Sequence, residues 1–277
     1  MKKIKKYLKE IINLIQKIPE HHVAAYAAQS AFFFILSLIQ IILLLMTLVQ
    51  YTPVTKADVM TAVIQIFPSS INTMITSIVN QVYNQSMGII PVTVLVALWS
   101  AGKGVLTLAT ALNTIFGCPE TRNYIYIRMR ATVYTVLFIM MLIVMLVLAV
   151  FGNTLNDFLM GHVPLLDRIE WLLIWLKNFV APVLLTILFL YVYKYLPNSD
   201  EIQLEEQVPG AIFAMAGWML CSWVFSVYLD IFEGFSNMYG SLTTIILIML
   251  WMYFSMYVIL LGGELNVMIQ NMKSEEE

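Results

Sequence analysis

The chain has 277 residues, of which 60% are hydrophobic and only 12% are charged, whereas about 25% of residues are charged in ordinary soluble domains. Its mean hydropathy is +0.83. The net charge of −2 indicates little by itself, because the distribution of charges matters more than their sum. This composition excludes a water-soluble globule and predicts an integral membrane protein.

Residues 1–22 precede the first long apolar block and form a basic, amphipathic segment. Ile4, Leu8, Ile11 and Ile15 recur at helical spacing among six lysines, as in a helix that lies on an anionic membrane surface. No short apolar region precedes a small-residue cleavage site, so we do not expect a cleavable signal peptide. The segment predicts a cytoplasmic surface helix.

The rest of the chain contains six apolar blocks without acidic or basic side chains. They run over 23–55, 89–102, 131–156, 178–193, 207–229 and 234–263. A bilayer-spanning helix needs about 20 mainly apolar residues, and the shorter blocks reach this length once lysines at their ends are allowed to snorkel. We therefore expect an all-α, polytopic protein with a single membrane domain over 23–272 and an acidic cytoplasmic tail over 273–277. The six expected transmembrane helices cover about 23–51, 89–116, 131–153, 176–197, 207–230 and 239–269.

The positions of lysine and arginine predict the orientation. With six spans, eleven of the basic residues lie on the side that carries both termini, and three lie on the other side. Since cytoplasmic loops are enriched in basic residues, both termini are expected in the cytoplasm.

Small residues in several spans predict close helix packing. In the first span, Ala24 and Ala28, and likewise Ala27 and Ala31, are four residues apart, a spacing that lets a neighbouring helix approach. The same argument applies to Ser100 with Gly104 in the second span and to Gly210 and Gly217 in the fifth.

Residues 52–88 form an external insertion that is too long for a simple turn. Apolar residues recur there at helical spacing on both sides of Pro68, which predicts two amphipathic helices. The polar face of the second helix carries no charge. Two interpretations stay open, a helix at the membrane interface and a cap over the mouth of a cavity.

Two ionisable residues lie within or near the expected spans, Lys103 and Glu264. Such charges normally face a bundle interior or a wet cavity. At about 1.5 Å per residue, Lys103 lies about 21 Å along its span and Glu264 about 34 Å along its own, so both lie towards the cytoplasmic side. Lys103 either snorkels, contacts Glu264, or has another partner. The small Ser100 and Gly104 beside it favour a packed or substrate-facing position.

Catalytic motifs are absent from the sequence. There is no G-x-S-x-G, H-E-x-x-H, P-loop or glycine-rich dinucleotide fingerprint. The three histidines, His21, His22 and His162, are expected on opposite sides of the membrane, and the two cysteines have no metal-ligand spacing. We therefore expect no enzyme, no metal and no cofactor. The acidic 199–207 loop on the cytoplasmic side argues against a nucleic-acid partner.

Several segments resemble the YihY/BrkB family of bacterial inner-membrane proteins. They are "AAYAAQSAFFFILSL", "LWSAGKGVLTLATALNTIFG", "YLPN", and the stretch from "PGAIFAMAGWML" to "MYGSLTTIILIMLWMYFSMYVILLGGELN". The family commonly has a proline where Gln40 stands in this chain. The resemblance implies six helices, cytoplasmic termini and the inner membrane. It also implies an envelope role linked to virulence, and it carries a ribonuclease label that the residues do not support.

These observations predict a transporter-like protein that moves a lipid or other amphipathic anion. The expected cavity lies among the first, second, fifth and sixth spans, with Lys103 attracting an anionic head group. Its other candidate lining residues are Gln40, Asn113, Tyr239, Glu264 and Asn266. Membrane lipids are the expected partners, and oligomerisation stays open. Two alternatives are a membrane scaffold or assembly factor, and a small-ion or proton-coupled carrier.

Overall fold

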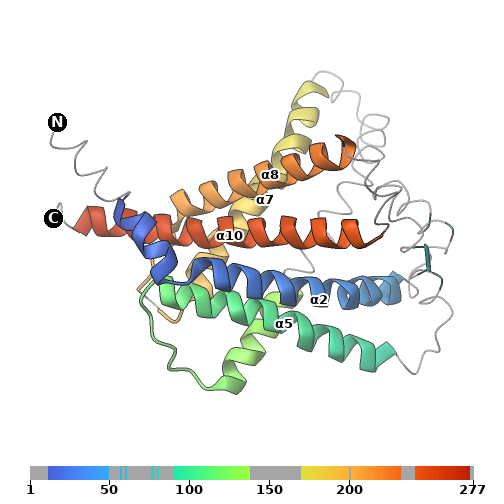
Figure 1. Cartoon of the computed structure of the whole chain (residues 1–277), viewed down its shortest axis with the longest axis horizontal. Coiled ribbons are helices and arrows are strands. Elements are labelled where there is room, and N and C mark those ends of the chain that lie inside the picture. The colour runs from blue at the N-terminus through green and yellow to red at the C-terminus, as the bar shows by residue number, and fades with distance from the viewer. Residues whose placement is uncertain are drawn as a thin grey trace.

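The computed structural model describes residues 12–49, 90–137, 170–199, 201–231 and 241–274, together with residues 57, 60, 76, 77 and 80. In these segments the regular secondary structure is helical, and they contain no strand. The all-α prediction is therefore confirmed for the part of the chain that the structure describes (Figure 1).

Five long helices dominate the described residues. They are α2 (Val23–Val49), α5 (Ile90–Ile115), α7 (Glu170–Tyr195), α8 (Val208–Ile231) and α10 (Ser241–Ser274), with the short 3-10 helix η3 (Glu205–Gln207) before α8. Two further helices cover residues 12–20 and 124–137. Each long helix overlaps one of the expected spans, although α7 begins six residues before the expected 176–197 and α10 ends five residues after the expected 239–269. Two stretches among the described residues, Glu205–Tyr228 and Ile245–Ser274, are long and apolar enough to cross a membrane.

Parts of the predicted topology lie outside the described residues. They include the third expected span beyond residue 137, nearly all of the 52–88 insertion, Tyr239 and the first eleven residues.

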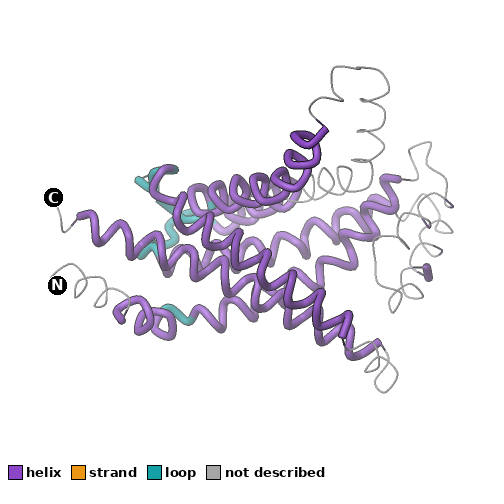
Figure 2. The backbone as a smooth tube through the Cα atoms, turned by 90° about the horizontal axis from the view of Figure 1, so that it is seen from above, coloured by secondary structure: helices purple, strands orange, loops and turns teal. Residues whose placement is uncertain are grey.

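The helix over 12–20 and the C-terminal end of α10 at Ser274 lie at the same end of the bundle, as both views show (Figures 1 and 2). At this end the C-terminal parts of α5, α7 and α10 meet the N-terminal parts of α2 and α8, and we call it the terminal end. Helix α2 packs against α5 and α10, and α8 packs against α7 and α10. Figure 1 shows α2, α5 and α10 running side by side along the long axis, while α7 runs obliquely to them.

The residues around α5 explain where that helix stops. Gly117 has a φ of 66°, a left-handed conformation that glycine adopts without steric cost. The amide of Cys118 donates to the carbonyl of Asn113 at 2.9 Å, and that of Gly117 to Thr114 at 3.3 Å, which is the Schellman pattern of a helix C-terminus. The next helix starts after Asn123, whose side chain accepts a hydrogen bond from the amide of Ile125 at 3.0 Å.

Small residues allow the helices to approach closely, although not all of the predicted ones do so. A Cβ on Gly104 would lie 3.0 Å from the Phe34 ring, one on Gly210 would overlap the carbonyl oxygen of Gly262, and one on Gly217 would overlap the Val258 side chain. The prediction that Ala24 and Ala28 pack against a neighbouring helix is wrong, because both side chains are exposed. The interleaved pair in the core is formed by Ala27 and Ala31, since this face of α2 is the one turned towards the bundle. The side chain of Ser100 lies outside the described residues.

The contact at Gly210 gives a test of this packing. We expect Gly210→Ala to lower the free energy of unfolding by about 1–3 kcal/mol, because the added methyl group overlaps the backbone of α10. Helix propensity alone favours alanine over glycine by about 1 kcal/mol, so it predicts the opposite sign. The measurement is thermal unfolding of the purified protein in detergent. The control is Ala216→Val at an exposed position of the same helix, and stabilisation by Gly210→Ala would contradict the close contact.

Candidate functional site

The crossing of α8 and α10 is held by a buried amide cluster. Asn266 accepts a hydrogen bond from the backbone amide of Gly210 at 2.7 Å and donates to the side-chain oxygen of Gln207 at 2.9 Å. All three residues are buried. Because each group has a partner, the cluster avoids the cost of unsatisfied polar atoms away from water. Asn266, predicted as cavity lining, therefore lies in a helix contact.

Glu264 lies two residues before Asn266 on α10 and contacts the N-terminal segment. It is only 2% exposed, and its Oε1 lies 2.6 Å from Nδ1 of His21. The side chain of His21 retains 19% exposure, so the pair joins the protein interior to the terminal surface. Of the alternatives open for Glu264, the structure therefore shows a contact with His21 and none with Lys103.

Asn113 is the centre of a second polar network, which joins α5 to the end of α7. Its side chain accepts from the amide of Asn198 at 2.7 Å and donates to Glu120 at 2.8 Å. Glu120 also receives two hydrogen bonds from the guanidinium of Arg122, at 2.7 and 2.6 Å. These bonds lower the pKa of the Glu120 carboxyl and raise the pKa of Arg122. Asn113 was also expected to line a cavity, but its side chain instead bonds the loop after α5 and the residues that follow α7.

Lys103 lies on the outer face of α5. Its side chain is exposed, and its ammonium group lies 5.6 Å from the centre of the Phe33 ring on α2. No carboxylate of the described residues forms an ion pair with it. Gln40 belongs to α2, but its side chain lies outside the described residues.

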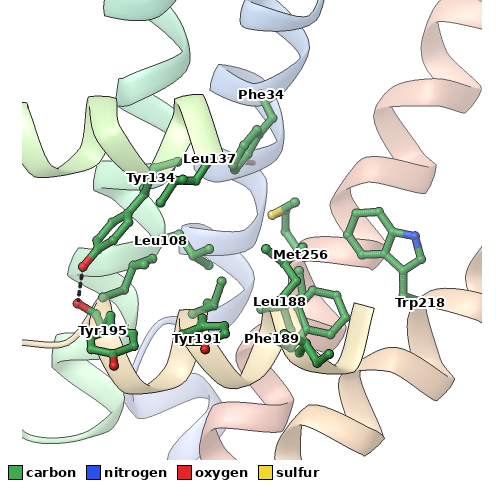
Figure 3. A pocket seen from close by; sticks show the side chains of 15 residues that line it. Phe34, Leu108, Tyr134, Leu137, Leu188, Phe189, Tyr191, Tyr195, Trp218 and Met256 are labelled. Atoms are coloured by element: carbon green, nitrogen blue, oxygen red, sulfur yellow. Dashed lines mark hydrogen bonds between the residues drawn. The ribbon is translucent and has the colours of Figure 1, made fainter. Parts of the chain in front are cut away.

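An apolar cavity of about 520 Å³ lies between the helices. Its wall contains side chains from α2, α5, the 124–137 helix, α7, α8 and α10, and Figure 3 shows that Phe34, Leu108, Met256 and Trp218 face it from different helices. The complete lining is Phe34, Val105, Leu108, Tyr134, Leu137, Ile187, Leu188, Phe189, Tyr191, Val192, Tyr195, Leu196, Trp218, Met256 and Ile259.

The cavity differs from the one that the sequence predicted. Of the predicted lining residues whose side chains the structure describes, Lys103, Glu264, Asn113 and Asn266, none contributes to its wall. The predicted polar residues instead form contacts between helices or face outwards, and aromatic and aliphatic side chains line the cavity. Helix α7 and the 124–137 helix, which the predicted cavity omitted, supply more than half of the wall.

One edge of the cavity is polar and carries a positive charge. Arg130 donates from Nε to the hydroxyl of Tyr134 at 2.8 Å and from Nη2 to the backbone carbonyl of Tyr195. The hydroxyl of Tyr134 also lies 3.4 Å from that carbonyl, which is the dashed contact in Figure 3. Tyr134 and Tyr195 both line the cavity, so we place the guanidinium at its rim, next to the lining residues but not among them.

Sequence reasoning missed His21, Arg130 and Gln207. A signal existed for His21, because the depth estimate for Glu264 placed it at the boundary where the first span begins. Arg130 was counted only as a cytoplasmic charge. Its role depends on two tyrosines that stand 4 and 65 residues away along the chain, and no local pattern links them.

Comparison with known proteins identifies the family. The model of the family described as "Virulence factor BrkB" matches residues 14–277. The chain belongs to this BrkB family. It is 32% identical over 270 residues to the "Putative ribonuclease-like protein YfkH" of Bacillus subtilis (strain 168), with 96% of each chain covered. No solved structure matches the chain.

Other BrkB-related proteins are named as membrane proteins. A "UPF0761 membrane protein" of Glaesserella parasuis serovar 5 (strain SH0165) is 32% identical over 98 residues, which is 35% of this chain and 34% of that protein. The "UPF0761 membrane protein IL2447" of Idiomarina loihiensis is 25% identical over 170 residues, covering 60% of this chain and 56% of that protein. The chain is thus a membrane protein of the BrkB family, as its sequence predicted.

The contact between His21 and Glu264 can be measured by a double-mutant cycle. We expect His21→Ala and Glu264→Met to be coupled by about 0.5–3 kcal/mol in the free energy of unfolding, because each removes the same buried hydrogen bond. The control pairs Glu264→Met with His22→Asn. His22 has a φ of 53°, which asparagine tolerates. Additive effects of the His21 and Glu264 variants would contradict the contact.

Proposed function

We propose that this BrkB-family chain binds a lipid or another amphipathic anion in the apolar cavity and moves it across the membrane. The observation that carries the proposal is the cavity itself. Its volume of about 520 Å³ lies within the range of roughly 300–1,000 Å³ that is usual for small-molecule sites. Its aliphatic and aromatic wall suits an acyl chain, which gains from leaving water and needs no hydrogen bond.

The charged rim supports an anionic ligand. Arg130 is held at the edge of the cavity by Tyr134 and Tyr195. A guanidinium has five N–H donors, and the two contacts use only part of this capacity. A phosphate or carboxylate head group placed at the rim gains a charge-assisted hydrogen bond, while its chain lies against Phe34 and Leu108. In this proposal Arg130 takes the role that the sequence analysis gave to Lys103.

The proposal includes the topology expected from the sequence. We infer six spans with both termini in the cytoplasm, in the inner membrane of a bacterium. Support comes from the length of the five long helices and from the 12–20 helix and the end of α10, which lie at the same end of the bundle as an even number of spans requires (Figure 1). The proposal assigns no catalytic role to any residue, and the ribonuclease-like name belongs to the Bacillus subtilis relative.

A second candidate function is a proton-coupled carrier, and the His21–Glu264 pair favours it. A buried carboxylate hydrogen-bonded to a histidine at a helix end is a common element of proton relays in transporters. In such a carrier the pair supplies the coupling, and the cavity still supplies the ligand site.

Blocking the cavity tests the leading proposal. Ile187 lines the cavity and is partly exposed, so Ile187→Trp can be accommodated while the added ring obstructs the space. The matched control is Val183→Trp, one turn earlier on α7, at an exposed position outside the lining. The measurement is the transbilayer movement of fluorescent lipids in proteoliposomes. We expect Ile187→Trp to slow it at least about tenfold, a loss of 1.4 kcal/mol or more, and Val183→Trp to leave it unchanged.

Arg130→Met forms the charge arm of the same experiment. We expect it to slow the movement of an anionic lipid while a zwitterionic lipid with the same chains moves as before. If natural protein moves neither lipid faster than empty vesicles, or if both tryptophan variants behave alike, the proposed function is wrong.

A further inference from the structure

Two cationic groups at the outer face of α5 have no carboxylate partner among the residues that the structure describes. One is Lys103, described above. The other is Arg128 of the 124–137 helix, whose guanidinium carbon lies 4.3 Å from the centre of the Trp99 ring and whose Nη2 donates to the Trp99 carbonyl at 2.6 Å. Trp99 and Lys103 are four residues apart, so they share one face of the helix. The two cations therefore border the same exposed strip of α5.

One hydrogen-bond donor of the Arg128 side chain has no partner. The residue is only 4% exposed, and its Nε atom is buried without a hydrogen-bond partner. The ion pairs formed among the described residues join Glu264 to His21 and Glu120 to Arg122, and neither includes Arg128 or Lys103. A buried cation without a counter-charge is costly, more so in a protein surrounded by lipid. An anion from outside the chain would remove that cost.

The surroundings indicate what kind of anion fits. Phe32 and Leu36 on α2 and Met129 and Val133 on the 124–137 helix are exposed, and they adjoin in sequence the residues that contact the strip. Trp99 itself is 56% exposed, an amphipathic ring of the kind that membrane interfaces favour. The two helices that contact the strip, α2 through Phe33 and the 124–137 helix through Arg128, thus expose apolar side chains close along the chain to those contacts.

We propose that this strip binds an anionic phospholipid. Its phosphate lies beside the exposed Lys103, next to the Trp99 ring on which Arg128 stacks, and its acyl chains lie on the exposed apolar side chains of α2 and the 124–137 helix. The site is separate from the cavity, because Val105 and Leu108 of the cavity wall are rotated roughly 140–200° around α5 from Lys103. It does not require that the protein transports anything.

Native mass spectrometry of the full chain in detergent tests the proposal. The probes are phosphatidylglycerol and phosphatidylcholine with identical acyl chains. We expect the natural chain to retain phosphatidylglycerol preferentially, and Lys103→Met and Arg128→Met each to weaken this preference roughly fivefold, the contribution of one basic residue near an anionic lipid. Lys273→Met removes an exposed charge at the end of α10 and is expected to leave the preference unchanged.

Two further variants keep the outcome interpretable. Lys103 is exposed, so Lys103→Met tests the site even if Arg128→Met fails to fold, and Arg128→Lys is expected to retain most of the preference because it keeps a charge. Ile187→Trp, which obstructs the cavity, is expected to keep the part of the phosphatidylglycerol preference that Lys103→Met removes, which separates this site from the proposed transport.

Three results overturn the proposal. The first is equal retention of the two lipids by the natural chain. The second is an equal loss for Lys103→Met and Lys273→Met. The third is retention of sn-glycerol 1-phosphate, which has no acyl chains, as strongly as the lipid, because this shows a soluble anion as the ligand.

Discussion

The close crossing of α8 and α10 is the contact on which the rest of the bundle depends. At Gly210 and Gly262 the two backbones approach so nearly that neither position has room for a methyl group, and Asn266 bonds the amide of Gly210 across the interface. In a membrane, helices gain little from hydrophobic burial against each other, so packing of small residues and interhelical hydrogen bonds decide their association. One turn earlier, Tyr193 of α7 donates to the carbonyl of Ile259 at 2.6 Å and brings a third helix to the same place.

Among the described residues, polar contacts between separate segments gather at the terminal end, and the cavity wall is apolar. Asn266, Glu264 and Asn113 each connect separate segments there, which fixes the ends of the helices. Further along the bundle, the space between the helices is lined by rings and aliphatic chains rather than by hydrogen-bonding groups. Arg130 lies at the transition between the two regions. A rigid polar end with an apolar space beside it is an arrangement that suits an amphipathic ligand, whose two parts need the two environments.

Sequence reasoning succeeded where one physical constraint acts on a long segment. The need for about 20 apolar residues per span located α2, α5, α8 and α10 closely, and the glycines of α8 were correctly expected at a close contact. It failed where the partner of a side chain had to be chosen. Depth along a helix placed Lys103 and Glu264 towards the same side of the membrane, but depth does not say which way around the bundle each one points. The structure turns Lys103 outwards and Glu264 towards His21. The predicted roles of Gln40 and Tyr239 lie beyond the described side chains.

The central claim is that the cavity of this BrkB-family protein holds an amphipathic molecule. Electron cryomicroscopy of the chain in nanodiscs of bacterial lipid tests it most directly. The account predicts an elongated density in the cavity between Phe34 and Trp218, with its polar end next to Arg130. A cavity that is closed by its own side chains, or filled by another segment of the same chain, would contradict the account.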